Sequence, residues 1–287
     1  MDVPFIKMHG LGNDYVYLDL LARPELAELD MAAFSISCSD RHRGIGSDGV
    51  ILIAPGDAET DVRMVMFNAD GSEGEMCGNG VRCVMRYAVA RGYAPQTLKV
   101  RARAGIIAGE VLPQGHVRVD MGVPRLDRQT LGFTGAGEMR EWACDVSGET
   151  LSLTGVSMGN PHVVSFCADR GALEARALRL GPILEHAPWA PARTNVEFVS
   201  VLAPGELAME VWERGSGRTE ACGTGACASL VAAALTGRSG RSARVHLAGG
   251  ALDITWREDG HVDMTGPTAL SFRGTYEWPR QEDGAAW

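Results

Sequence analysis

The pattern of apolar positions predicts two helices, and each follows a short glycine-rich segment. In the first helix, apolar residues recur every three or four positions, at Val81, Val84, Met85, Ala88 and Val89. This spacing places them on one face of a helix that Gly92 would end. The second helix, 226–236, is rich in Ala and Leu and has Gly237 as its C-terminal cap.

Elsewhere, short apolar runs between glycine-rich turns predict mostly strands. We expect these strands at 50–54, 62–67, 117–121, 196–201 and 252–256. Two shorter surface helices are expected at 26–37 and 173–180. The chain is therefore expected to belong to the α+β class.

An internal repeat organises the chain. Cys77 and Cys222 each begin the sequence Cys-Gly-x-Gly and lie 145 positions apart. A polar residue stands nine positions before each cysteine, Asn68 in one case and Glu213 in the other. The pairs 12–13 and 159–160 are both Gly-Asn, and the loop 44–49 precedes 193–195 by about 146 positions. Matches at nearly one offset predict two similar halves, placed face to face.

The repeat also predicts the domain boundaries. One domain would comprise 1–121 together with 268–287 and would carry Cys77, and the other would comprise 122–267 and would carry Cys222. The tail 268–287 is too short to fold alone, so we expect it to pair with the first half. Hinges near 121–124 and 266–268 would let the halves close around a substrate.

Composition excludes several classes of protein. The 287 residues are 45% hydrophobic and 22% charged, which is typical of a globular protein and not of a disordered one. No apolar run approaches the roughly 18 residues of a membrane helix, so we expect no membrane partner. The net charge of −9 argues against a nucleic-acid partner, because neutralising phosphates needs clustered basic residues.

Cysteine and lysine usage narrow the chemistry. None of the seven cysteines forms a Cys-x-x-Cys pair, which disfavours zinc-ribbon and thioredoxin-like sites. Reduced thiols and the lack of a signal-like N-terminus predict a cytoplasmic protein. Only Lys7 and Lys99 could form a Schiff base with pyridoxal phosphate.

A cysteine at a helix N-terminus lies at the positive end of the helix dipole, so we expect the pKa of Cys77 and of Cys222 to be lowered. The glycines beside them leave backbone amides open to a carboxylate. Two such sites could bracket one small anion. One thiolate would remove a proton from a carbon, and the thiol on the opposite face would return one, which inverts the carbon.

The other cysteines, Cys38, Cys83, Cys144, Cys167 and Cys227, are more simply explained as small buried apolar residues. His9 is more simply a turn-capping residue. Asparagines are also common in turns, and only their positions at the repeat offsets favour a role in ligand binding.

Together, several motifs make the sequence resemble the diaminopimelate epimerase family. They run in order from residue 8 to residue 227: MHGLGND (8–14), DRHRGIGSD (40–48), FNADGSE (67–73), MCGNGVR (76–82), MGNPH (158–162), NVEF (195–198), ERG (213–215) and ACGTGAC (221–227). The resemblance implies two pseudo-symmetric domains, each a curved, barrel-like mixed sheet around a central helix. It also implies a homodimer that interconverts LL- and meso-diaminopimelate, in lysine and peptidoglycan precursor synthesis, without a cofactor or metal.

The resemblance further assigns roles to individual residues. Cys77 and Cys222 would be the two acid/base residues, and His162 and Glu213 would assist them. The small-molecule substrate would be bound by Asn13, Asn68, Gly78, Asn79, Asn160, Asn195, Glu213, Arg214, Gly223 and Thr224. The amides of 78–79 and 223–224 would hold the reacting carboxylate, and Arg214 with the asparagines would hold the distal end.

One position departs from the family pattern, and other functions stay open. Many family members have Gln after Gly-Ile-Gly-x-Asp, where this chain has Gly49, which cannot supply a side-chain amide. An alternative is therefore a racemase of the same fold with another substrate, such as histidine. Two further alternatives are a redox-sensing pair formed by Cys77 and Cys222, and a binding protein without catalytic activity.

Overall fold

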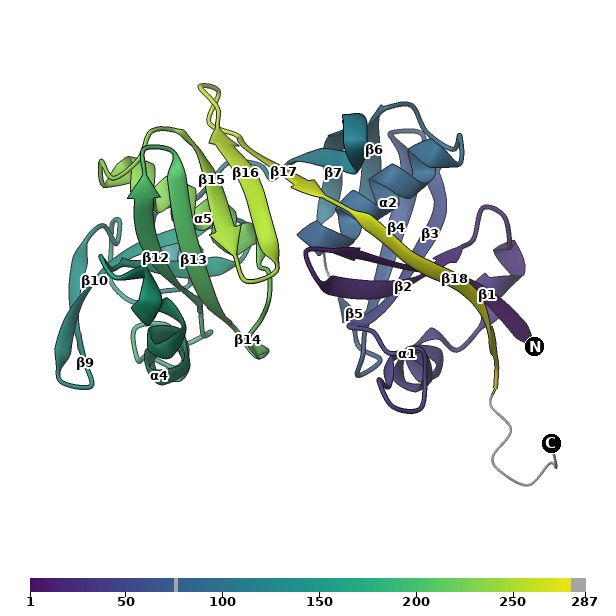
Figure 1. Ribbon diagram of the computed structural model, residues 1–287, viewed down its shortest axis with the longest axis horizontal. Coiled ribbons are helices and arrows are strands. Elements are labelled where there is room, and N and C mark those ends of the chain that lie inside the picture. Colours follow the sequence, from purple (N-terminus) through teal and green to yellow (C-terminus); the bar gives the residue numbers. More distant parts are fainter. Residues whose placement is uncertain (75–76, 280–287) are drawn as a thin grey trace. The chain divides into compact units, whose positions relative to one another are not determined.

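The computed structural model describes residues 1–74 and 77–279. The contacts between residues divide the chain into two compact units (Figure 1). The first unit runs from Met1 to Val119 and resumes at Pro267, and the second is Asp120–Gly266. We propose that these units are the two domains expected from the repeat, for which the sequence places the boundaries after 121 and after 267.

The first unit is built on one mixed sheet. Its strands are β1 (Asp2–Gly10), β2 (Asn13–Asp19), β3 (Gly49–Asp57), β4 (Thr60–Asn68), β5 (Glu73–Gly74), β6 (Thr97–Ala102), β7 (Gly105–Val111), β8 (His116–Asp120) and β18 (Ala269–Glu277). They pair in the order β18–β1–β2–β3–β4–β6–β7–β8, and β5 pairs with β4. The pairs β2–β3 and β4–β6 are parallel, and the others are antiparallel.

The second unit repeats this arrangement. Its strands are β9 (Trp142–Val146), β10 (Glu149–Ser157), β11 (Pro161–Phe166), β12 (Asn195–Ala203), β13 (Glu206–Glu213), β14 (Gly217–Arg218), β15 (Ser242–Leu247), β16 (Gly250–Trp256) and β17 (Val262–Pro267). They pair as β9–β10–β11–β12–β13–β15–β16–β17, with β14 on β13. The parallel pairs, β11–β12 and β13–β15, stand at the same places in the order. The two halves of the sequence therefore fold alike.

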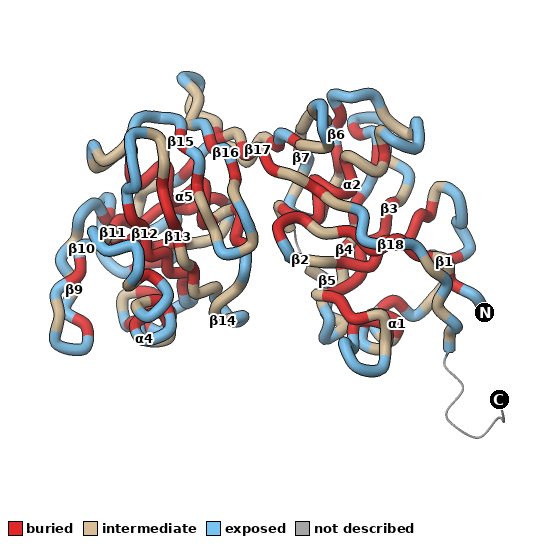
Figure 2. The backbone as a smooth tube through the Cα atoms, viewed as in Figure 1, coloured by how far each residue is buried: buried red, intermediate tan, exposed pale blue. Residues whose placement is uncertain are grey.

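Each sheet packs against a helix that follows one of the two Cys-Gly-x-Gly sequences. Helix α2 (Gly78–Ala90) contacts β1, β2, β4, β6 and β7, and α5 (Gly223–Leu235) contacts β10 to β13, β15 and β16. Most of α5 is buried (Figure 2). Alternation along the strands gives each sheet a second apolar face, because neighbouring side chains point to opposite sides. In the first unit this face packs on α1 (Met31–Ser39), and in the second on α4 (Leu173–Glu185).

The remaining helical segments are short. They are η1 (Pro24–Glu28), η2 (Pro113–Gly115), α3 (Arg128–Leu131) and η3 (Arg170–Ala172). The helix expected at 26–37 is wrong as a single surface element. The Asp30 carboxylate accepts a hydrogen bond from the amide of Ala33 and so begins a separate helix, α1, in which Phe34 and Cys38 are fully buried.

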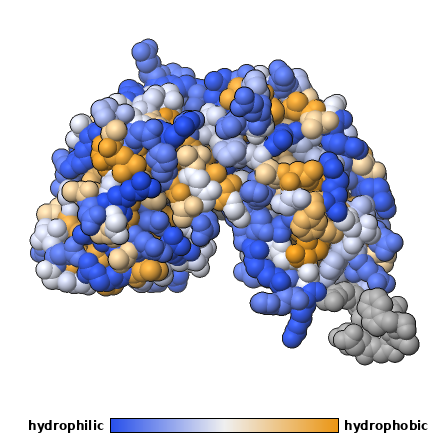
Figure 3. All heavy atoms as spheres, in the orientation of Figure 1, coloured by the Kyte–Doolittle hydropathy of each residue, from blue (hydrophilic) through white to orange (hydrophobic). Residues whose placement is uncertain are grey.

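The other predicted elements are confirmed, with shifted ends. The helices after the two cysteines begin earlier than the apolar pattern indicates, because the glycine and polar residues of their first turns carry no apolar signal. The helix expected at 173–180 continues to Glu185. The C-terminal tail does pair with the first half, since β18 runs antiparallel to β1. Leu270 and Phe272 on β18 are exposed, and Figure 3 shows hydrophobic atoms where this strand crosses the first unit.

Candidate active site

Cys77 and Cys222 occupy the same position in their units, as the N-terminal caps of α2 and α5. Each has an extended backbone, and its sulfur accepts a hydrogen bond from the amide three residues later. The distance from Sγ to the amide nitrogen is 3.3 Å for Gly80 and 3.4 Å for Gly225. Both sulfurs therefore lie at the positive end of a helix dipole, as the sequence predicts.

The first turn of each helix carries backbone amides suited to an anion. The first intrahelical donors are the amides of Val81 and Ala226, which bond to the carbonyls of the two cysteines. Amides that precede these donors cannot bond within the helix. The amides of 78–79 and 223–224, which the resemblance assigns to the reacting carboxylate, are of this kind.

The second glycine of each Cys-Gly-x-Gly lies close to the end of a side chain on a neighbouring strand. A Cβ at Gly80 would lie 2.6 Å from the Cδ1 atom of Ile51, and one at Gly225 would lie 2.8 Å from Oε1 of Glu197. Both distances are too short for real atoms. The strand beneath each helix therefore approaches its first turn closely, with an apolar side chain in the first unit and a carboxylate in the second.

In the first unit, Asn13 is the predicted residue that contacts the thiol. Its Oδ1 lies 3.2 Å from Sγ of Cys77, which donates to it. Its Nδ2 donates to Asp48 at 2.7 Å, and Asp48 also accepts from the amide of Asp14. Tyr15 hydrogen-bonds the same thiol. The sequence predicts no role for Asp48, which ends the motif 40–48, or for Tyr15, which directly follows the motif 8–14.

The other two predicted asparagines of this unit make different contacts. Nδ2 of Asn68 donates to the Ser72 hydroxyl at 2.9 Å. Oδ1 of Asn79 accepts from Nη2 of Arg82 at 2.8 Å, and both side chains are buried. The Asn79 side chain is thus turned toward Arg82, and its backbone amide hydrogen-bonds the thiol of Cys77.

In the second unit, a chain of polar side chains leads to the other thiol. Oγ1 of Thr224 lies 3.5 Å from Sγ of Cys222 and accepts from Nδ2 of Asn160 at 3.3 Å. Oδ1 of Asn160 lies 3.0 Å from Nε2 of His162. Nδ1 of His162 lies 2.6 Å from Oε1 of Glu197. Asn160, His162 and Thr224, all predicted from the sequence, therefore form one network with Cys222.

Glu213, Asn195 and Arg214 surround this network. The Thr219 hydroxyl donates to Glu213, which also hydrogen-bonds Cys222. Both ends of the Asn195 side-chain amide hydrogen-bond to the backbone. Nδ2 donates to the carbonyl of Pro161, and Oδ1 accepts from the amide of Arg214. The Arg214 side chain is exposed, and its guanidinium makes a long 3.4 Å bond to the carbonyl of Ala192.

The expected lowering of the thiol pKa is wrong for both cysteines. Burial raises the pKa of Cys77 despite the bond from Gly80. Burial raises the pKa of Cys222 well above its usual value, and the negative charges of Glu213 and Glu197 add to the rise. Desolvation disfavours the thiolate more than the helix end stabilises it. The sequence shows the helix start but not the depth at which the sulfur lies.

Gly49 stands where the backbone requires glycine. Its φ is +153°, and a Cβ would lie 2.1 Å from the carbonyl oxygen of Phe67 on the paired strand. A glutamine would not fit this backbone without a shift of the strands. The departure from the family pattern is therefore built into the local geometry of β3 and β4.

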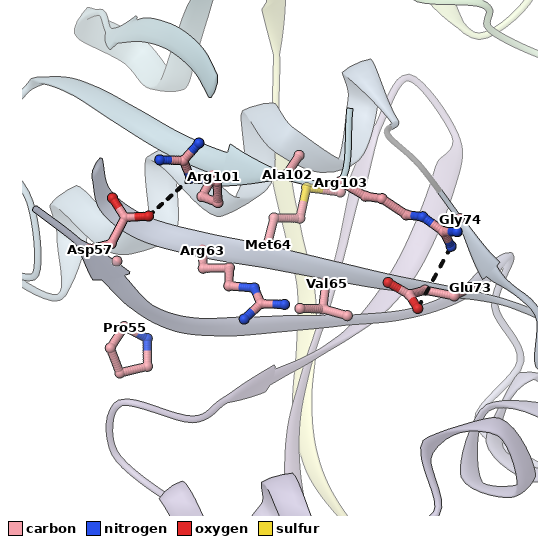
Figure 4. Close-up of a pocket in the computed structure, with 11 residues that line it drawn as sticks. Pro55, Asp57, Arg63, Met64, Val65, Glu73, Gly74, Arg101, Ala102 and Arg103 are labelled. Atoms are coloured by element: carbon pink, nitrogen blue, oxygen red, sulfur yellow. Dashed lines mark hydrogen bonds and ion pairs between the residues drawn. The ribbon is translucent and has the colours of Figure 1, made fainter. Parts of the chain in front are cut away.

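The first unit also has a cavity of about 440 Å³ (Figure 4). It is lined by Pro55, Gly56, Asp57, Arg63, Met64, Val65, Glu73, Gly74, Arg101, Ala102 and Arg103. Two of its three arginines are paired with carboxylates, Arg101 with Asp57 and Arg103 with Glu73. No predicted site residue lines this cavity.

Two features are absent from the described residues. Across 1–74 and 77–279, no group of three or more His, Cys, Asp or Glu side chains has the arrangement to hold a metal ion. In the same ranges, no helix is both long and apolar enough to cross a membrane.

Comparison with known proteins identifies the family. The sequence model of diaminopimelate epimerase matches residues 5–126 and 154–270. The chain belongs to the diaminopimelate epimerase family. It is 48% identical over 279 residues to the diaminopimelate epimerase of Moorella thermoacetica, covering 95% of this chain and 98% of that protein. It is 49% identical over 282 residues to that of Desulforudis audaxviator, covering 96% and 99%.

Solved structures at low identity share the fold of this family member. A phenazine biosynthesis protein of the PhzF family from Bacillus anthracis superposes with a TM-score of 0.71 at 15% identity, covering 96% of this chain and 99% of that one. A hydroxyproline epimerase from Agrobacterium vitis gives 0.66 at 14% identity, covering 96% and 91%. The α+β class expected from the sequence is confirmed.

Proposed function

We propose that this protein is a diaminopimelate epimerase that interconverts the LL and meso forms of its substrate without a cofactor. The observation that carries the proposal is the duplicated cap, in which Cys77 and Cys222 each place a sulfur at the first turn of a buried helix. The names of the curated relatives, at 45–49% identity over nearly the whole chain, support the same reaction. An enzyme with this activity would act in lysine and peptidoglycan precursor synthesis.

In the proposed mechanism, both thiols act on the α-carbon of one substrate. One sulfur, as thiolate, takes the α-proton, and the electron pair of the broken C–H bond is delocalised into the carboxylate. The other sulfur, as thiol, gives its proton to the opposite face and is left as thiolate. Reaction in the reverse direction exchanges the two roles.

The α-proton of an amino acid is a weak acid, so the developing charge needs stabilisation. The amides of 78–79 and 223–224 would supply it by donating to the carboxylate as negative charge builds there. Both thiols have a raised pKa, which makes each a stronger base once it is ionised. The raised pKa also means that the active thiolate is scarce at neutral pH.

Recognition of the distal end would fall to Arg214, whose guanidinium is exposed, and to polar groups near it. Asn195 would act mainly by tying together the backbone that presents Arg214, because its amide already bonds to Pro161 and Arg214. Asn13, Asn160 and Thr224 would order the polar groups around the two sulfurs. Gly49 supplies no side chain, so a backbone group or water would take that place.

Exchange of α-hydrogen in deuterated water tests the function. We expect LL-diaminopimelate to gain deuterium as it is converted to the meso form, and histidine to gain none. Preferred exchange of histidine would replace the proposal with the racemase of the same fold. Absence of exchange with either substrate in reduced protein would favour the redox pair or the inactive binding protein.

We also propose that the protein is a cytoplasmic homodimer, as the family resemblance implies. Exposed Leu270 and Phe272 on β18 offer apolar surface that a second copy could cover. Light scattering of the purified protein should give a mass near twice the 30.6 kDa of one chain. A mass near that of one chain would contradict the dimer.

A further inference from the structure

Glu197 has no role assigned so far, although it lies beneath the Cys222 helix. Its side chain is fully buried on β12, and Oε1 lies 2.6 Å from Nδ1 of the equally buried His162. Among the described residues, its second oxygen, Oε2, has no hydrogen-bond partner. A buried carboxylate is costly unless a positive charge balances it. His162 is the group placed to supply that charge.

The repeat shows that this pair is special to the second unit. The register that places Val164 opposite Glu197 also places Tyr17 opposite Ile51 in the first unit. Two positions earlier on the same strands, His162 corresponds to Tyr15. The first unit therefore has a phenol and an apolar side chain where the second has an imidazole and a carboxylate. The common fold does not require a charged pair at this place.

Both ring nitrogens of His162 lie within hydrogen-bond distance of an oxygen. A carboxylate only accepts, so Nδ1 carries a proton toward Glu197. Oδ1 of Asn160, at 3.0 Å from Nε2, is also an acceptor, so both ring nitrogens face acceptors, an arrangement that suits an imidazolium. The donors then run in one direction, from His162 to Asn160, to Thr224 and on to the sulfur of Cys222.

We propose that Glu197 is a positioning residue for the epimerase reaction, which holds His162 as an imidazolium and so directs the Thr224 hydroxyl toward Cys222. The inference rests on the proposed function and deepens it. If the ring loses a proton, Nε2 becomes an acceptor and the Asn160 amide must turn. The hydroxyl of Thr224 then loses the donor that directs it. Charge on His162 and hydrogen bonding to the sulfur are coupled in this way.

Other titratable groups also face this pair. Glu213 lies near His162 from the end of β13, and Cys222 faces it from the cap of α5. The Glu197–His162 pair is neutral as a whole when both members are charged. The negative charge of Glu197 on its own adds to the raised pKa of Cys222, so losing that charge alone would lower the pKa. Losing the hydrogen bond from Thr224 to the sulfur acts in the opposite direction, and the direction of the shift therefore separates the two effects.

The Glu197→Gln variant tests the proposal because glutamine keeps the size and can still accept from Nδ1. We expect kcat to fall about tenfold at neutral pH with little change in KM. Activity should recover partly at lower pH, where the imidazolium forms without its carboxylate. Glu197→Asp, which keeps the charge, should retain the wild-type pH profile. Ile51→Val, at the matched position of the first unit, should also keep that profile.

Alkylation of the thiols by iodoacetamide gives a readout that does not depend on diaminopimelate. In Glu197→Gln, the pH dependence of Cys222 alkylation should move to higher pH, while Cys77 in the same molecules stays unchanged. An unchanged Cys222 profile would overturn the proposal. A shift to lower pH would also overturn it, because Glu197 would then act on the sulfur only as a bare negative charge. If wild-type protein fails to exchange diaminopimelate hydrogen, the proposed function fails and this readout still decides the role of Glu197.

Discussion

The carboxylate of Asp48 accepts a hydrogen bond from Nδ2 of Asn13 at 2.7 Å, and this contact sets which end of the amide faces Cys77. A carboxylate cannot donate, so the NH2 group of Asn13 stays on its side. Oδ1 is left 3.2 Å from the sulfur, where it accepts from the thiol. This arrangement favours the protonated thiol of Cys77, in agreement with its raised pKa.

Replacing Asp48 by asparagine should loosen this arrangement. An asparagine can donate as well as accept, so the Asn13 amide could turn its NH2 group toward the sulfur. A hydrogen bond to a charged group contributes about 1.5–3 kcal/mol. We expect kcat/KM for diaminopimelate to fall about tenfold in Asp48→Asn, since about 1.4 kcal/mol corresponds to one decade. Steady-state kinetics would measure the loss.

Asp40→Asn is the matched control, because the Asp40 carboxylate accepts from the nearby amides of His42 and Arg43 and, among the described residues, has no hydrogen bond to Asn13. Its activity should stay close to that of the wild type. Equal losses in the two variants would show that Asp48 acts only through the stability of its loop.

The two capping cysteines should both be essential. In Cys77→Ser and Cys222→Ser, a hydroxyl replaces the thiol, and it is too weak an acid to supply the base at neutral pH. We expect epimerisation to be lost in each variant. Cys144→Ser, which changes a partly exposed thiol packed near Trp189, should keep most of its activity. Substantial epimerisation by either capping variant would contradict the two-base mechanism.

Arg214 should contribute more to kcat/KM for diaminopimelate than for a substrate without a distal carboxylate. Its guanidinium is exposed without ligand and would form a charge-assisted bond to the distal carboxylate. We expect Arg214→Ala to lower kcat/KM for diaminopimelate by at least about tenfold. An analogue that lacks the distal carboxylate should lose less, because it never forms the bond. The same loss for both substrates would place Arg214 at the reacting end or in a structural role.

Glu213 should control the ionisation of Cys222. Burial is the largest cause of the raised pKa of Cys222. The negative charge of Glu213 is the second cause, because it repels the thiolate. Glu213→Gln removes this charge, so the pKa should fall and alkylation of Cys222 should shift to lower pH. Alkylation of Cys77 in the same protein should not shift. Glu210→Gln, on the same strand but bonded to Arg218, is the control.

The sequence predicted the parts of the fold that repeat. The spacing of Cys77 and Cys222, with Asn13 and Asn160 at nearly the same offset, predicts two similar halves, and the strand orders of the two units agree. Helix starts were less predictable from apolar spacing, since a cap is formed by polar side chains. Asp30 shows this, because its carboxylate divides a stretch that looks continuous by hydrophobicity.

The sequence predicted the site residues whose side chains have distinctive chemistry, but not the environment of those side chains. Cysteines at helix starts were visible, but the depth of burial that raises their pKa depends on the packing of whole units. The sequence predicts no catalytic or binding role for Glu197, although it lies in the motif NVEF (195–198), because a carboxylate in a strand usually faces solvent. Aligning the two halves of the repeat matches Glu197 with Ile51. A carboxylate at a position where the other half has an apolar residue is the signal that would have singled out Glu197.

The pairing of β18 with β1 has a consequence for the order in which the chain folds during synthesis. The first unit cannot complete its sheet until Glu277 has left the ribosome, because β18, which pairs with β1, follows every other described strand. The second unit is continuous, Asp120–Gly266, and its strands are all available earlier. Contacts between distant parts of a chain form slowly. The unit that carries Cys222 is therefore expected to mature on the ribosome while the unit that carries Cys77, although synthesised first, still waits for its closing strand.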